Sequence, residues 1–125
     1  MGLVTTDVSA AAATLAAGRL CAIPTETVYG LAADASYPAA VAAVFTAKGR
    51  PSDHPLIVHV AGIEDVAQWI TDLPSWAPAL MQACMPGPLT IVGNRTSAAS
   101  DAVTGGQGTV AVRAPSHPVA HQLLT

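Results

Sequence analysis

The chain has 125 residues, of which 51% are hydrophobic, 10% are charged and 4% are aromatic, and its formal net charge is −3. This length suits one domain with a core of mainly aliphatic side chains, and the negative charge argues against nucleic-acid binding through bulk electrostatics. Arg19 and Pro24 interrupt the most apolar stretch, so we expect no membrane-spanning segment. No basic and apolar leader precedes Asp7, which predicts a cytoplasmic location.

Helices and short strands alternate in the first half of the sequence. Asp7 or Ser9 can cap a helix that continues to Ala17, and Gly18 then provides its stop. Apolar runs and proline positions predict the next elements, which are a buried strand at 20–23, a strand at 29–33 and a helix at 38–48.

The second half continues this alternation. Residues 56–60 are apolar apart from one histidine and predict a central strand. The other predicted elements are short helices at 64–70 and 76–84, strands at 89–92 and 109–112 separated by a polar loop, and a helix that starts at His117. The irregular spacing favours an α/β fold with mixed strand directions over a simple doubly wound sheet.

A hydroxyl-rich turn follows the first buried strand. It contains Thr25, Thr27 and Tyr29 within five residues. These side chains either satisfy backbone groups where the strand bends or line a substrate site, because turns at strand ends commonly bind ligands in α/β proteins.

Lys48 and Arg50 stand together at the end of a predicted helix, just before Pro51. Two interpretations remain open for them. They either interact with the helix dipole and solvent, or they bind a phosphate group, with the proline stiffening the exit. No GxxxxGK[ST] or GxGxxG loop follows a predicted strand, so the common phosphate-binding loops are absent.

Four further polar residues stand out from the apolar sequence. His59 lies inside an apolar strand, where a buried neutral histidine is common. His117 and His121 have a metal-ligand spacing on one helix face, but no third ligand is evident and we expect no metal site. Arg113 ends a strand and suits two-point binding of a carboxylate.

Read in order, several segments resemble the YrdC-like family. The matching segments are IPTETVYGL at 23–31, KGRP at 48–51, HPLIVHV at 54–60, PGPLT at 86–90, the Thr-Gly-Gly region at 104–106, and TVAVRAP at 109–115 followed by His117-Pro118. The resemblance implies a twisted, open α/β sheet of mixed strands, with flanking helices around a concave cavity.

The resemblance also implies an enzyme, a nucleotidyltransferase that makes L-threonylcarbamoyladenylate. Such enzymes join L-threonine, bicarbonate and ATP and release pyrophosphate, and Mg²⁺ can help to neutralise the ATP. The product serves threonylcarbamoyl modification of adenosine 37 in tRNA, so the implied partners include the proteins that transfer the group to tRNA.

Family roles can be assigned to the matching positions of this sequence. The resemblance implies that Lys48 and Arg50 bind ATP and are catalytic, with Tyr29 and Thr90 nearby in the nucleotide site. It further implies that Thr25, His59 and Arg113 bind threonine, with Arg113 on the carboxylate.

One departure from the family pattern concerns the end of the sequence. Family members carry a Ser-x-Asn segment after the helix that here begins at His117, and this sequence stops at Thr125 before such a segment. We therefore expect a single YrdC-like domain over residues 1–125 that lacks its C-terminal part and exposes an apolar sheet edge, and the activity of this chain on its own stays open. Two alternatives stay open: a non-catalytic module that binds RNA, and a carbamoyl-adenylate-forming domain of a hydrogenase-maturation protein.

Overall fold

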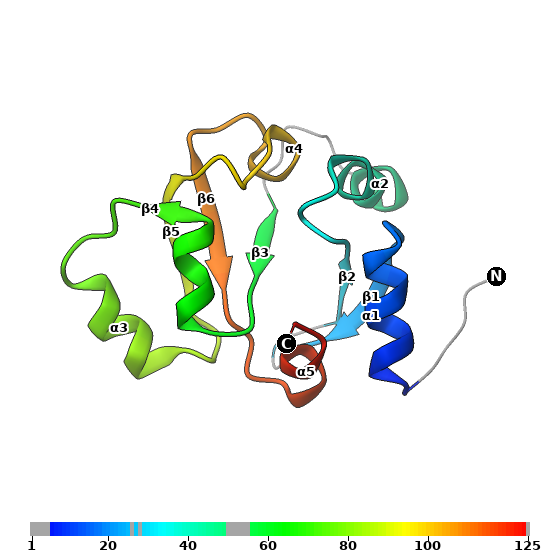
Figure 1. The fold of residues 1–125 in the computed structure, drawn as a ribbon, viewed down its shortest axis with the longest axis horizontal. Helices are drawn as coiled ribbons and strands as arrows, with labels where there is room; N and C mark the ends of the chain where they lie inside the picture. The colour runs from blue at the N-terminus through cyan, green and yellow to red at the C-terminus, as the bar shows by residue number, and fades with distance from the viewer. Residues whose placement is uncertain (1–5, 26, 28, 50–55, 125) are drawn as a thin grey trace.

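The computed structural model describes residues 6–25, 27, 29–49 and 56–124. A β-hairpin and its helices form one side of the molecule, and a four-stranded sheet with its helices forms the other (Figure 1). The predicted α/β fold with mixed strands is confirmed. Within the described part of the chain, no helix combines the length and the apolar character needed to cross a bilayer.

The hairpin pairs β1 (Cys21–Pro24) with β2 (Tyr29–Ala32) in antiparallel fashion. Helix α1 (Val8–Ala16) precedes it and is capped by the Asp7 carboxylate, which accepts hydrogen bonds from the backbone N–H groups of Ser9 and Ala10 at 3.0 and 3.3 Å. Asp7 is therefore the cap, and not Ser9. Helix α2 (Pro38–Lys48) follows the hairpin, begins with proline as predicted, and ends at Gly49 in the left-handed region.

The larger sheet has the strand order β3-β6-β5-β4. Its strands are β3 (Ile57–His59), β4 (Ile70–Thr71), β5 (Thr90–Arg95) and β6 (Thr109–Arg113). β3 runs parallel to β6, whereas the β5–β6 and β4–β5 pairs are antiparallel. The prediction that 56–60 is a central strand is wrong for the described sheet, because β3 is its edge and only one side of β3 pairs with a neighbour there.

Two other predicted segments differ in the structure. The predicted helix at 64–70 is a 3₁₀ helix, η1 (Ile63–Gln68), because the buried Ile70 instead pairs with Arg95 as the start of β4. The predicted polar loop contains a single helical turn, α4 (Asp101–Thr104), which Gly105 closes with a φ of 64°. The helices α3 (Ala77–Cys84) and α5 (Pro118–Leu124) agree with prediction to within one residue.

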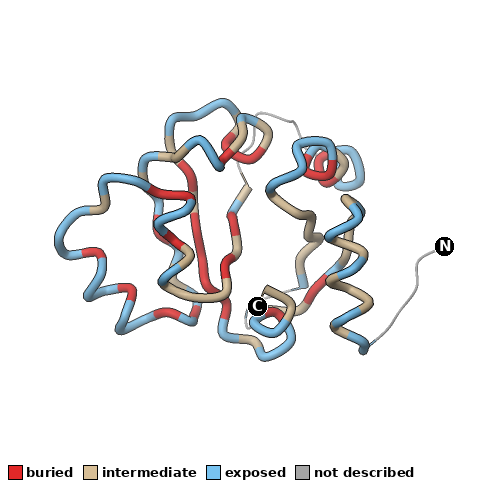
Figure 2. Tube along the Cα trace, viewed as in Figure 1, coloured by how far each residue is buried: buried red, intermediate tan, exposed pale blue. Residues whose placement is uncertain are grey.

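One face of the sheet carries the hydrophobic core, and Figure 2 shows buried residues along β6. The core contains strand residues and side chains from η1, α2 and α3, among them Val58, Val66, Phe45, Met81, Ile91, Val110 and Val112. The opposite face is open. Ile57 is 47% exposed and Val92 is 65% exposed, and the register aligns both with Ala111 of the intervening strand β6.

Candidate functional site

Three of the predicted site residues form one row across the open face of the sheet. The strand register aligns His59 of β3 with Arg113 of β6, and Arg113 with Thr90 of β5. Because neighbouring strands lie about 4.8 Å apart, side chains at aligned positions on the same face are direct neighbours. The flanking residues of each strand point to the core, so alternation along the strands brings these polar side chains together.

Arg113 is the best-fixed cation of this row, at 9% exposure. Its Nε donates a hydrogen bond to the Gly87 carbonyl oxygen at 3.4 Å, and its Nη1 donates to Thr27 Oγ1 at 3.2 Å. Both of these acceptors are neutral oxygen atoms, so a carboxylate placed beside Arg113 would gain Coulomb energy in a partly desolvated setting.

The turn between β1 and β2 brings a hydroxyl pair to Arg113. The Oγ1 atoms of Thr25 and Thr27 lie 3.0 Å apart, and the Thr27 N–H donates to Thr25 Oγ1 at 3.3 Å. These bonds fold the turn back on itself, as is common for threonine side chains at bends. The turn therefore reaches from the hairpin to the end of β6.

An apolar cavity of about 430 Å³ lies between the hairpin and β3. Aliphatic side chains line most of it, including Ile23, Leu31, Val41, Val44, Leu56 and Val58. Thr25 and His59 supply polar groups to its wall, and His59 Nδ1 lies 3.1 Å from the Ile57 carbonyl oxygen. Lys48, Tyr29, Thr90 and Arg113 are not among the described residues that line this cavity.

The residues that the resemblance assigns to ATP binding lie farther apart than those it assigns to threonine binding. Lys48 is exposed in the last turn of α2, which packs on α4 near the beginning of β3 (Figure 1). The His59–Arg113–Thr90 row occupies the far end of that strand. Tyr29 is 77% exposed at the start of β2. Arg50 lies outside the described residues, so its predicted role stays a prediction.

Metal ligands do not gather in the ranges that the structure describes: no three His, Cys, Asp or Glu side chains form a cluster there. His117 Nδ1 instead accepts a hydrogen bond from the Val119 N–H at 3.2 Å, at the start of α5.

Two contacts of the site were not assigned from the sequence. Thr27 was noticed only as part of the hydroxyl-rich turn, yet it binds Arg113 across 86 positions of sequence. Gly87 offers its carbonyl oxygen to Arg113, and a Cβ there would collide with the Cys84 carbonyl oxygen. The repeated Thr-x-Thr spacing was the available signal for the first contact, and the glycine between two prolines was the signal for the second.

Comparison with known proteins settles the family. Residues 13–125 match the family model Sua5/YciO/YrdC, described as "Telomere recombination". The chain belongs to the Sua5/YciO/YrdC family. The resemblance carried by the motifs is thereby confirmed.

Two curated relatives within this family are each more than 40% identical to the chain over the aligned residues. A protein of Pyrococcus abyssi named threonylcarbamoyl-AMP synthase is 46% identical over 107 residues, which is 86% of this chain and 32% of that protein. A Bacillus subtilis protein of the same name is 45% identical over 119 residues, or 94% of this chain and 34% of that protein. The chain thus spans about a third of the length of these relatives.

A solved structure gives the corresponding result for the fold. The crystal structure of P. abyssi Sua5 complexed with L-threonine is similar with a TM-score of 0.91 and 44% identity. The similarity covers 93% of this chain and 34% of that one.

Proposed function

We propose that the chain carries out, within the Sua5/YciO/YrdC fold, the synthesis of L-threonylcarbamoyladenylate from L-threonine, bicarbonate and ATP. The observation that carries this proposal is the row of His59, Arg113 and Thr90 beside the Thr25–Thr27 hydroxyl pair. The relative solved with L-threonine supports it, because its fold matches at a TM-score of 0.91.

In the proposed complex, L-threonine lies on the open face of the sheet. Its carboxylate pairs with Arg113, and Thr25 and His59 bind its remaining polar groups from the hairpin and from β3. Its nitrogen points along β3 toward the α2 end, where Lys48 stands. This direction brings the reacting nitrogen toward the proposed phosphate site.

The apolar row of Ile57, Ala111 and Val92 supplies the contact for the threonine methyl group. This row lies two residues along each strand from the polar row, which is about 7 Å in a β-sheet. We propose that the small Ala111 between two larger side chains leaves a shallow notch, which suits a single methyl group. Burying one such group is worth about 0.8 kcal/mol, or roughly fourfold in preference over serine.

The chemistry divides into two steps. The threonine nitrogen attacks bicarbonate carbon with loss of water, which gives the N-carboxylate. An oxygen of this carboxylate then bonds to the α-phosphorus of ATP, while the bond from that phosphorus to pyrophosphate breaks. Lys48 and Arg50 stabilise the charge on the α-phosphate and the departing pyrophosphate, which is the main contribution a protein makes to such transfers.

Tyr29 and Thr90 complete the nucleotide side of the proposed site from the hairpin and from β5. Because the described residues offer no carboxylate cluster, Mg²⁺ would arrive with ATP and be held by its phosphate oxygens. We place the reaction in the cytoplasm, where the product serves the proteins that transfer the threonylcarbamoyl group to tRNA.

The test is pyrophosphate release by the purified chain with ATP, bicarbonate and L-threonine. Reactions with L-serine and without amino acid are the controls. Release that depends on L-threonine supports the proposal, whereas no release, or release that is equal without amino acid, contradicts synthase activity of this chain. Calorimetric titration with L-threonine measures the binding site separately from catalysis.

A further inference from the structure

Helix α4 is a single turn of four residues, Asp101–Thr104, and it packs against both β6 and α2 (Figure 1). A helix this short does not persist through its own hydrogen bonds, because the first turn fixes more backbone torsions than its few bonds can offset. Contacts with the rest of the chain must therefore hold it in place. Two sets of such contacts are present among the described residues, one with β5 and one with α2 and the start of β3.

The first set joins α4 to Arg95 at the end of β5. Arg95 Nη1 lies 2.7 Å from Asp101 Oδ1, donates to Thr104 Oγ1 at 3.0 Å and approaches the Ala99 carbonyl oxygen at 3.5 Å. Thr104 is 1% exposed and also donates its own hydroxyl to the Ser100 carbonyl oxygen at 3.4 Å. Arg95 thereby contacts the first and the last residue of α4, and the Thr104 hydroxyl is used both as acceptor and as donor.

The second set joins α4 to the elements around Lys48. The Val103 carbonyl oxygen accepts the Leu56 N–H at 2.8 Å, immediately before β3 begins. Val103 is 1% exposed and belongs to the same core cluster as Phe45, which lies one turn before Lys48 in α2. Helix α4 therefore supports the helix that ends at Lys48 as well as the start of the next strand.

We infer that Thr104 is a positioning residue for the proposed triphosphate site. Together with Arg95 it holds α4 against α2 and the start of β3, and this support determines where Lys48 stands at the end of α2. The role rests on the proposed function, in which Lys48 binds the phosphate groups of ATP. Because the Thr104 side chain is almost fully buried and hydrogen-bonded in both directions, it acts through α4 and not by contact with the ligand.

The Thr104 hydroxyl is the buried part of this support. The Asp101 side chain is 78% exposed, and ion pairs at such an exposed position contribute little. Without the Thr104 hydroxyl, Arg95 would keep only this weak contact within α4, and the turn could shift more easily relative to α2. Lys48 would then meet the phosphate oxygens from a wider range of positions, and the affinity would fall because more freedom is lost on binding.

The experiment measures the binding of two probes to variants of the whole chain by NMR chemical-shift titration. Inorganic tripolyphosphate tests the cation site at Lys48, and L-threonine tests the row of His59 and Arg113 at the other end of β3. The variants are Thr104→Val, which removes the hydroxyl at nearly constant volume, and Thr104→Ser, which restores it. Thr14→Val is the matched control, because Thr14 Oγ1 also donates to a carbonyl oxygen four residues earlier, at 3.0 Å in α1.

We expect Thr104→Val to weaken tripolyphosphate binding about fivefold, a typical effect of one lost hydrogen bond. The affinity for L-threonine should stay at the parental value, Thr104→Ser should recover most of the loss, and Thr14→Val should bind both probes like the parent chain. Equal losses for both probes would indicate a general loss of stability and overturn the inference, as would unchanged tripolyphosphate binding. A parent chain that does not bind tripolyphosphate would overturn the triphosphate assignment of Lys48 itself, and this outcome is recognised without any variant.

Arg95→Met provides an independent measurement if Thr104→Val does not fold. It removes the donor to Thr104 and keeps a long, unbranched side chain. Arg19→Met is its control, because it removes the same charge from an exposed position beyond α1. We expect Arg95→Met to weaken tripolyphosphate binding about fivefold and Arg19→Met by less than about twofold. Equal losses in the two arginine variants would show a general effect of net charge and contradict the role of α4.

Discussion

Arg113 combines burial with contacts from two distant parts of the chain. Its guanidinium touches Gly87 before β5 and Thr27 in the hairpin turn. A neutral side chain in its place would leave the carboxylate of a bound amino acid without a cationic partner. Under the proposed function, we therefore expect the residue to govern the affinity for threonine more than the rate of the chemical step.

The first prediction concerns this cation. Arg113→Ala should raise the KM for L-threonine about 100-fold with a smaller change in kcat, since a lost charge-assisted contact costs roughly 2–3 kcal/mol. The KM of Arg113→Lys should lie between those of the parent chain and Arg113→Ala, because a lysine ammonium keeps the charge but does not bind a carboxylate through a planar fork. Initial rates against L-threonine concentration measure both effects, and an unchanged threonine dependence would remove Arg113 from this role.

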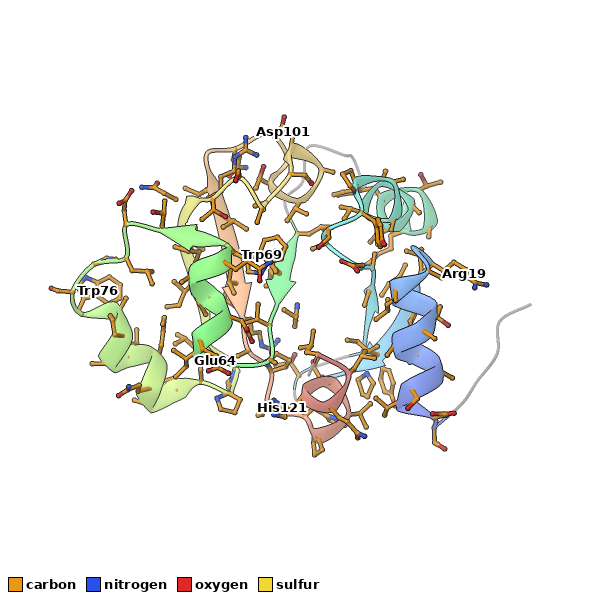
Figure 3. All side chains as sticks on the ribbon, in the orientation of Figure 1. Arg19, Glu64, Trp69, Trp76, Asp101 and His121 are labelled. Atoms are coloured by element: carbon orange, nitrogen blue, oxygen red, sulfur yellow. The ribbon has the colours of Figure 1, made fainter. Side chains whose placement is uncertain are left out.

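Lys48 provides the second prediction at this scale. Lys48→Ala, and likewise Arg50→Ala, should lower kcat for adenylate formation by roughly 100-fold, because charge on the triphosphate is then poorly stabilised. The fold should persist, since Lys48 is exposed. Arg19→Ala is the matched control, because Arg19 is an exposed cation whose side chain projects outward beyond α1 (Figure 3). Pyrophosphate release at the parental rate in either site variant would contradict the assignment.

The grouping of individual candidate residues was predictable as far as motifs reach, and their roles stay predictions. Thr25, His59 and Arg113 were selected from the sequence, and the structure places all three near the junction of hairpin and sheet. The partner of Arg113 was not predictable, because Thr27 contacts it across 86 positions and no local pattern encodes such a contact. The pairing appears only once the hairpin and the sheet are placed together.

At the scale of elements, strand register organises the open face into rows. Polar His59, Arg113 and Thr90 form one row, and apolar Ile57, Ala111 and Val92 form the next. The site is thus a property of three paired strands and of their alternation, and not of any loop alone. Small changes of side-chain volume in one row should change substrate preference without changing the fold.

The prediction for this face is a loss of discrimination. Ala111→Val should fill the notch between Ile57 and Val92 and raise the KM for L-threonine about tenfold, with a smaller effect on L-serine. Valine is favoured in strands, so β6 should remain intact. The control is Thr109→Val, one row farther along the same face and opposite Asn94. A threonine-to-serine ratio that stays at the parental value would exclude the notch as the methyl site.

Most elements were predictable, and the exceptions have local causes. Periodicity and proline positions located α1, α2 and α3 within about one or two residues. The segment 56–60 was predicted to be a central strand because it is apolar. A strand is apolar both when it pairs with a neighbour on each side and when one of its sides faces an apolar cavity, as β3 does, so hydrophobicity alone does not distinguish the two cases. The turn α4 was missed because four helical residues are too few for a periodic pattern.

For the molecule as a whole, α5 is the element that joins the hairpin to the sheet at one end. It follows β6 in sequence and packs against α1 and β1 (Figure 1). Ala120 is fully buried at this junction, whereas Gln122 of the same helix is exposed. We expect the relative placement of Thr27 and Arg113 to depend on this packing.

A charge buried at that junction should therefore weaken the packing that holds the hairpin and the sheet together. Ala120→Asp should lower the free energy of unfolding by roughly 3 kcal/mol, since an unpaired carboxylate is costly to bury. Gln122→Asp places the same charge on the solvent side and should cost about 0.5 kcal/mol or less. Urea denaturation of both variants measures the difference, and equal unfolding midpoints would show that α5 does not hold the hairpin and sheet together.

The position of β3 at the edge of its sheet has a consequence for isotope exchange. The Val60 N–H donates to the Arg113 carbonyl at 2.9 Å on the β6 side, and alternation puts the Val58 N–H on that side as well. The amides of Ile57 and His59 then point away from β6, toward the cavity beside the hairpin. In deuterium oxide, we expect the Ile57 amide to lose its proton much sooner than the amides of Val58 and Val60, so that protection differs between the two sides of one short strand. Addition of L-threonine should slow the exchange at His59 first, because its side chain is proposed to contact that ligand.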